Sequence, residues 1–231
     1  MNTISFQSVY QTQTNPAFTI GEKAMTPDGR EWVYVKAESA LAKGSVAVPS
    51  AVTAVDTVSS STDALGRIIY ITEASAGWTP GQFADGIGVV DDGTGVGQTF
   101  KIRSNTADTL ILYPETALTT ALAVADSDIT IRTLNLVAKA AITDKVQSAQ
   151  GVAQVAFAAN DYGWILKRGA GSVLAGEVLV VGKSFVTGDD TTGQVVKGTT
   201  AKGDFDEQSL GYALVANAAV DQNALVFVDI A

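Results

Sequence analysis

The sequence predicts an all-β protein, built as a short-stranded β-barrel or sandwich domain with a smaller inserted β subdomain and an extended N-terminal arm. Short apolar runs rich in β-branched and aromatic residues recur along most of the chain. Gly- and Asp-containing turn signals separate these runs. The length of 231 residues fits one large β domain or two small ones.

The arm is predicted for residues 1–25, because residues 1–20 contain no charged residue and no Gly. A solvated disordered tail normally carries charge and lacks aromatic residues. About 20 extended residues reach roughly 60–70 Å, several times a domain radius of about 17 Å. The segment therefore resembles an arm that docks on another surface, while an ordinary first strand with a frayed end is the alternative. The apolar side chains expected to make the contact are Ile4, Phe6, Val9, Tyr10 and Phe18.

The outer domain is predicted to combine residues 26–55 with residues 138–231. Its strands are expected at 31–36, 45–49, 164–168, 179–186, 194–197, 211–215 and 224–230. When the chain is shifted by 132 positions, Trp32 falls on Trp164 and Gly44 on Gly176. The match indicates either an internal duplication or the common composition of two hairpins.

Residues 56–137 are predicted to form the inserted subdomain. Strands are expected at 67–72, 99–104, 109–113 and 129–137, a hairpin connection at 105–108, and one or two helical turns within 114–126. Residues 77–98 are rich in Gly and Asp and are expected to form a long irregular loop.

Composition excludes several function classes. The chain has no Cys and no His, which removes disulfides, thiolate nucleophiles, the commonest general base and the commonest transition-metal ligand. A net charge of −9 and scattered basic residues argue against nucleic-acid binding. With 46% hydrophobic and 17% charged residues, the composition suits a protein that lies against other proteins. No signal peptide or membrane span is expected, so synthesis and assembly are expected in the host cytoplasm.

The candidate chemical motifs favour structural explanations. The glycine-rich run 93–97 leads into a strand instead of a helix, so it is not expected to bind a phosphate. The acidic groups at 91–92, 189–190 and 204–207 lack EF-hand spacing and are predicted to serve turns and solubility, with calcium as the alternative. Trp32 and Trp164 are expected in the core, which leaves little for a carbohydrate site. We therefore expect no catalytic residues, no metal and no cofactor, and no enzyme.

The C-terminal part carries a resemblance to a known class of proteins. Residues 162–165 (YGWI), 174–176 (LAG) and 211–213 (GYA), followed by Asp221 and the apolar stretch 226–228, resemble small β-barrel structural proteins of tailed phages. Residues 97–122 are similar to segments of marine phage virion proteins. The family indicated is that of capsid decoration (cement) proteins.

That resemblance implies a virion protein on the capsid exterior that binds the major capsid protein and itself, as a homotrimer. It would bridge major capsid protein subunits and so reinforce the shell, with neither nucleic acid nor membrane as a partner. A phage tail, fibre or receptor-binding component that recognises a host surface glycan is the alternative. An enzyme or carbohydrate-binding module is a third possibility, which would need a concave site lined by Trp and carboxylates.

Overall fold

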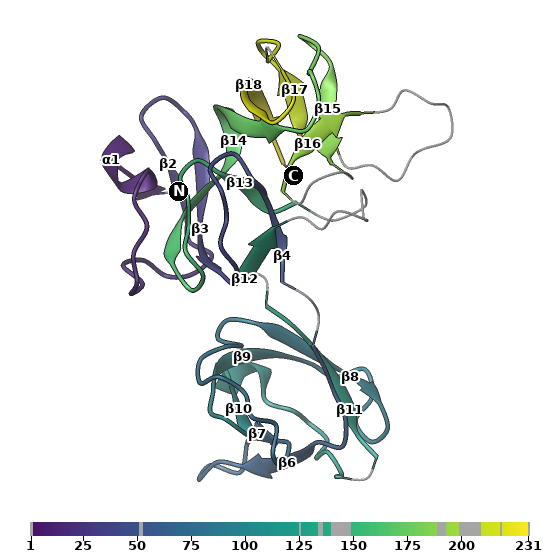
Figure 1. Ribbon diagram of the computed structural model, residues 1–231. Helices are drawn as coiled ribbons and strands as arrows, with labels where there is room; N and C mark the ends of the chain where they lie inside the picture. Colours follow the sequence, from purple (N-terminus) through teal and green to yellow (C-terminus); the bar gives the residue numbers. More distant parts are fainter. Residues whose placement is uncertain are drawn as a thin grey trace. The chain divides into compact units, whose positions relative to one another are not determined.

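The chain folds into two compact units in a computed structural model (Figure 1). The structure describes residues 2–50, 53–124, 126–133, 136–139, 149–188, 193–198, 209–217 and 219–230. Unit 1 comprises Met1–Pro49 and Asn135–Ala231, and unit 2 comprises Ser50–Leu134. Within the described residues the only helical segments are α1 (Phe6–Val9) and the 3-10 turn η1 (Pro114–Thr116). The all-β prediction is confirmed.

Unit 1 contains one sheet in the order β1-β2-β3-β12-β4-β13-β14-β16-β15-β17-β18. Its strands are β1 (Asn2–Thr3), β2 (Lys23–Met25), β3 (Glu31–Ala37), β4 (Val46–Pro49), β12 (Leu136–Lys139), β13 (Gly151–Ala153), β14 (Tyr162–Ala175), β15 (Ser184–Thr187), β16 (Val195–Lys197), β17 (Gly211–Ala213) and β18 (Gln222–Asp229).

The long strand β14 takes part in two closed rings of five strands. Its first half pairs with β3 and β13, and β12 and β4 complete this first ring. Its second half pairs with β18 from Arg168 to Ala175, and β17, β15 and β16 complete the second ring. A register shift between Leu166 and Arg168 lies where β14 passes from one ring to the other. Irregularities of this kind bend a strand, which lets one strand serve both rings.

Strand β3 lies between two apolar clusters and is buried on both faces. On β3, Val33 and Val35 belong to one apolar cluster, which also holds Ile165 of β14. Trp32 and Tyr34 point to the opposite face and join a larger cluster. Because both faces of β3 are covered, its sequence EWVYVKA lacks the polar alternation of a half-exposed strand.

Unit 2 contains a second sheet in the order β5-β11-β8-β9-β10-β7-β6. Its strands are β5 (Thr53–Val55), β6 (Ser59–Thr62), β7 (Ile68–Thr72), β8 (Ile87–Asp92), β9 (Thr99–Asn105), β10 (Thr109–Leu112) and β11 (Asp128–Arg132). One apolar cluster, which includes Trp78, Phe83 and Phe100, fills this unit. The predicted hairpin connection between β9 and β10 is present, closed by a bond from the Thr106 amide to the Thr109 carbonyl (2.9 Å).

Three strand predictions were wrong in part. Strand β8 lies inside the predicted loop 77–98, where Gly88 faces the Phe100 ring and gives it room. The predicted strand 129–137 is divided into β11 and β12, which belong to different units. The predicted strand 179–186 begins only at Ser184, because the preceding residues form a loop bonded to Asn217.

Candidate functional site

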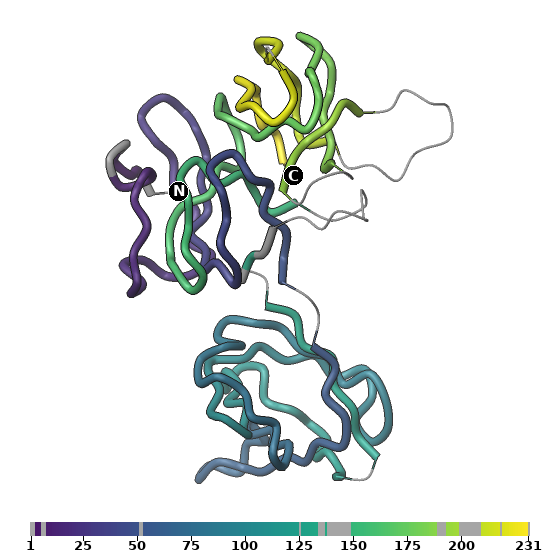
Figure 2. Tube along the Cα trace, in the orientation of Figure 1, coloured from purple at the N-terminus to yellow at the C-terminus, as the bar shows by residue number. Residues whose placement is uncertain are grey.

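The N-terminal segment, defined here as residues 2–20, lies against its own unit (Figure 2). Strand β1 pairs in parallel with β2, and the Ile4 amide continues the contact to the Met25 carbonyl (3.0 Å). Further along, Gln13 and Tyr162 exchange two backbone hydrogen bonds (2.9 and 2.7 Å). The backbone of the segment is therefore fixed to unit 1 at its start and at Gln13.

The five predicted arm residues do not form an exposed row. Val9 is completely buried and Ile4 is 8% exposed, and both belong to the larger core of unit 1. Phe18 is partly buried and packs against the same core. Tyr10 is exposed, and the Phe6 side chain lies outside what the structure describes. The structure thus places Ile4 and Val9 in the unit's own core and leaves Tyr10 on the surface, and contact of the segment with another protein stays a prediction.

The segment covers an aromatic face made by β3 and β14. The Phe18 ring meets the Tyr34 ring edge-on at 5.3 Å and the Trp164 ring at 5.1 Å. The Tyr34 hydroxyl accepts a hydrogen bond from the Ala17 amide and donates one to Gln13 Oε1 (both 3.1 Å). Burial raises the pKa of Tyr34 above its ordinary value. Sequence and packing thus agree that the tryptophans of unit 1 are core residues.

Arg30 fastens the middle of the segment. Its Nη1 donates to the Tyr10 hydroxyl (2.7 Å) and its Nε to Asp28 Oδ2 (2.6 Å). The guanidinium also lies over the Tyr10 and Trp32 rings, at 5.8 and 5.2 Å from their centres. Burial alone would raise the pKa of Asp28, but hydrogen bonds from Thr26 and Arg30 outweigh it and lower that pKa.

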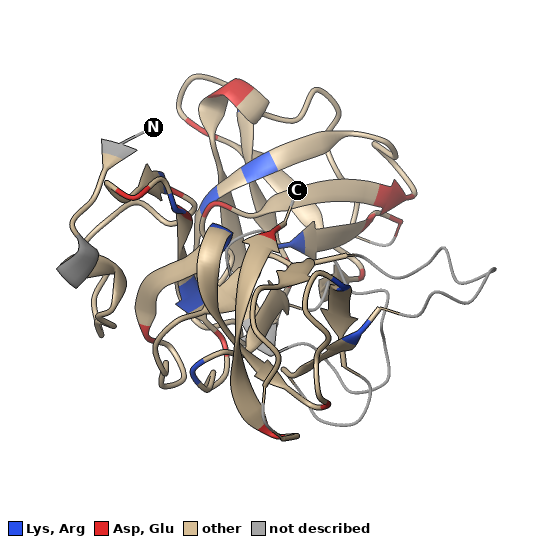
Figure 3. Ribbon diagram, turned by 90° about the horizontal axis from the view of Figure 1, so that it is seen from above, with Lys and Arg blue, Asp and Glu red and all other residues tan. Residues whose placement is uncertain are grey.

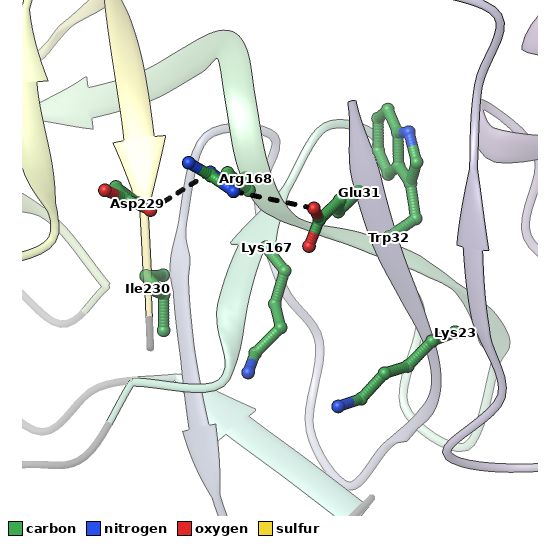
Figure 4. A pocket seen from close by; sticks show the side chains of 7 residues that line it. All are labelled: Lys23, Glu31, Trp32, Lys167, Arg168, Asp229 and Ile230. Atoms are coloured by element: carbon green, nitrogen blue, oxygen red, sulfur yellow. Dashed lines mark ion pairs between the residues drawn. The ribbon is translucent and has the colours of Figure 1, made fainter. Parts of the chain in front are cut away.

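Two adjoining surface depressions, of about 290 and 340 Å³, lie beside this contact and share Glu31 and Arg168. Figure 4 shows Arg168 between Glu31 and Asp229, with ion-pair distances of 3.8 and 3.4 Å. Arg168 is 56% exposed, and exposed pairs of this kind contribute about 0.2–1 kcal/mol. These two ion pairs therefore add little to the stability of unit 1.

A second feature of unit 1 is an exposed apolar area, which we call the valine-rich surface. It consists of large apolar side chains that are 36–58% exposed: Val178, Val180, Val181, Tyr212, Leu214, Val215, Val220 and Leu225. Sequence reasoning missed it, because residues 179–186 were assigned to a strand. The consecutive apolar residues at 178–181 were the sequence feature that could have indicated an exposed apolar surface.

The parts of the valine-rich surface are bonded to one another. The Gly182 amide donates to the Ala213 carbonyl (2.8 Å), and the Leu214 amide donates to the Leu225 carbonyl (3.0 Å). Buried Asn217 accepts a hydrogen bond from the Leu179 amide (2.7 Å) and donates to the carbonyls of Glu177 and Ala219. The loop that carries Val178, Val180 and Val181 is thereby held beside β17 and β18.

The sequence also contains the glycine-rich run 93–97 and three acidic groups as candidate motifs. In the run 93–97 the Thr94 amide donates to Asp126 Oδ2 (2.7 Å) and the Gly93 amide to Asp92 Oδ1 (2.8 Å), so carboxylates take these donors. The acidic groups at 189–190 and 204–207 lie outside the described residues. Within the described parts of the chain, no group of three or more metal-ligating side chains gathers, and no helix is long and apolar enough to cross a membrane.

Comparisons with known proteins give one structural likeness. No family model and no curated protein matches the chain. Among solved structures, the chain is similar to the N base of head fiber gp8.5 in bacteriophage phi29. The identity is 14% and the TM-score 0.30, over 87% of this chain and 94% of that one.

Proposed function

We propose that this chain is a structural virion protein of a tailed bacteriophage and no enzyme. It attaches to the outside of an assembled capsid and reinforces the shell by bridging major capsid protein subunits. The observation that carries the proposal is the valine-rich surface, because large apolar side chains gathered on a folded unit mark contact with another protein.

Charge and sequence support the same role. A net charge of −9 disfavours the side of a shell that faces DNA, since DNA repels an acidic protein. Figure 3 shows the charged residues along the ribbon, and from residue 209 to residue 230 they are only Asp221 and Asp229. The motifs at 162–165, 174–176 and 211–213 resemble those of small phage β-barrel proteins. This resemblance is the reason for proposing a phage capsid as the partner.

The N-terminal segment is the proposed capsid contact, through the side chains that it exposes on the surface of unit 1. Ile4 and Val9 are committed to the core of unit 1, so they are not available to a partner. Tyr10 is 43% exposed in a stretch without charged residues. Tyrosines are enriched among the residues that dominate binding energies at protein interfaces.

Co-sedimentation with capsids tests the proposal. The intact protein is mixed with assembled capsids of the phage that encodes it, and separately with unassembled major capsid protein. We expect binding to the assembled shell and weaker binding to free subunits, as a reinforcing protein requires. A chain that ignores capsids but binds host cells would be a fibre or receptor-binding component instead.

The variant Tyr10→Ala tests the contact itself. We expect it to weaken capsid binding at least about tenfold, or roughly 1.4 kcal/mol. Leu65→Ala, at a residue that is 76% exposed in unit 2, is the control and should bind like the unchanged protein. Equal binding by both variants would show that the segment is not the attachment element.

A further inference from the structure

The valine-rich surface has a side-chain arrangement that its strand register defines. Tyr212 of β17 is paired with Phe227 of β18, and their rings stack at 5.3 Å. Leu225 lies two residues before Phe227 on the same strand and therefore on the same face. Val226 and Val228 point to the opposite face and are completely buried. Strand β18 thus presents apolar side chains both to the core and to the outside.

The surface is comparable in size to apolar patches that mark protein contacts. With roughly 60–120 Å² of apolar surface for a fully exposed Val or Leu side chain, the exposed fractions of its eight residues amount to roughly 200–450 Å². This is in the range of the largest apolar patches on soluble monomers, which are often functional. Two such surfaces facing each other would bury roughly 400–900 Å² of apolar surface, and their polar margins add to it toward the roughly 1,000 Å² expected of a biological interface.

The charge distribution indicates which partner fits. Each copy carries a net charge of −9, so two copies repel unless they meet where carboxylates are few. Within the described residues the surface meets that condition, because none of its eight residues is charged, and its margin carries both signs. Lys183 follows the exposed valines, and Glu177 forms an ion pair with Lys197 at 3.2 Å. An uncharged centre with a margin of mixed sign is suited to a second copy of itself, in which residue i meets residue j and the reverse.

The strand topology indicates that this part of unit 1 contacts another molecule by side-chain packing and not by strand pairing. In the ring of β14, β18, β17, β15 and β16, each strand has a neighbour on both sides. A ring without a free edge does not add a strand from another molecule. Contact at this part of unit 1 must therefore use the outward side chains.

We infer that the valine-rich surface is the interface through which copies of this chain associate with one another. The inference deepens the proposed structural role, in which a protein contact at this surface was left without a partner. Self-association would also strengthen weak attachment to a repeating shell, because a second contact on one assembly forms at a high effective concentration.

Sedimentation velocity of the purified full chain, at about 0.1–100 µM, tests the inference. The variant Val215→Lys/Leu225→Lys places two charges on the surface at residues that are 53% and 49% exposed. The control Leu65→Lys/Val96→Lys makes the same change at exposed residues of unit 2. We expect the unchanged protein and the control to self-associate, and the surface variant to dissociate at concentrations at least tenfold higher.

A charge-reversal experiment shows whether the copies meet at the same face. Val215→Lys and Val215→Glu proteins should each associate poorly, and their mixture should recover association. Thermal unfolding checks that each variant is folded, and Val181→Lys, in the exposed loop, replaces the double variant if that one is unstable. A chain that stays monomeric to 100 µM, or a control that dissociates like the surface variant, overturns the inference. A monomeric chain that still binds capsids would refute the self-association alone, and an associating chain that ignores capsids would refute the capsid proposal alone.

Discussion

The substitution Phe18→Ala tests directly whether the N-terminal segment is part of the folded unit. Phe18 is partly buried and packs edge-on against the rings of Tyr34 and Trp164. Losing its partial burial costs about 1–2 kcal/mol, and the two ring pairs contribute about 0.5–1.5 kcal/mol each. We expect the free energy of unfolding of unit 1 to fall by about 2–5 kcal/mol, a range that overlaps the values seen for fully buried phenylalanines.

The positions of the tryptophans allow the unfolding of unit 1 to be measured separately from that of unit 2. Trp32 and Trp164 lie in unit 1, and Trp78 lies in the core of unit 2. In a Trp78→Phe background, tryptophan fluorescence during urea unfolding therefore reports unit 1 alone. The control Phe83→Ala removes a buried ring from unit 2 and should leave this signal unchanged. If Phe18→Ala unfolds at the same urea concentration as the parent, the segment is a free arm and its packing on unit 1 is refuted.

Three further predictions concern single residues of unit 1. Asn217→Ala leaves buried backbone groups without their amide partner and should lower the free energy of unfolding by about 2–4 kcal/mol in urea titration, with Asn217→Asp intermediate. Gly211→Ala, at φ +140° with its added carbon against a backbone carbonyl, should lower the melting temperature far more than Gly182→Ala, which has φ +75° and open space around it. Because the pKa of Asp28 is lower in the folded state, its stabilising effect is present at neutral pH and is lost as the pH falls below about 3.9 through the folded value. Asp28→Asn should therefore reduce the loss of stability between about pH 5 and pH 2, whereas an equal loss in both proteins would contradict that role.

The fold class could be predicted from sequence because strand and turn signals are local. The β9–β10 hairpin and the burial of Trp32 and Trp164 follow from such patterns. The docking of the N-terminal segment could not be predicted, because it depends on an aromatic face that Tyr34 of β3 and Trp164 of β14, about 130 positions apart, build together. Strand β8 was missed because Gly88 weakens a strand signal, although the fold needs its small size beside Phe100.

The role of the N-terminal segment follows from where its apolar residues are used. An uncharged segment with spaced apolar side chains can contact any apolar surface. The sequence alone does not show whether that surface belongs to its own unit or to a neighbouring protein. Here Ile4 and Val9 belong to the core of unit 1. Releasing them to a neighbour would expose side chains whose burial stabilises the unit by about 1.5–3 kcal/mol each. Attachment by withdrawal of the segment would thus have to recover that energy in the complex. The valine-rich surface has no such cost, because its side chains are already exposed in the folded chain, and this is why we assign association between copies to that surface and not to an exchanged arm.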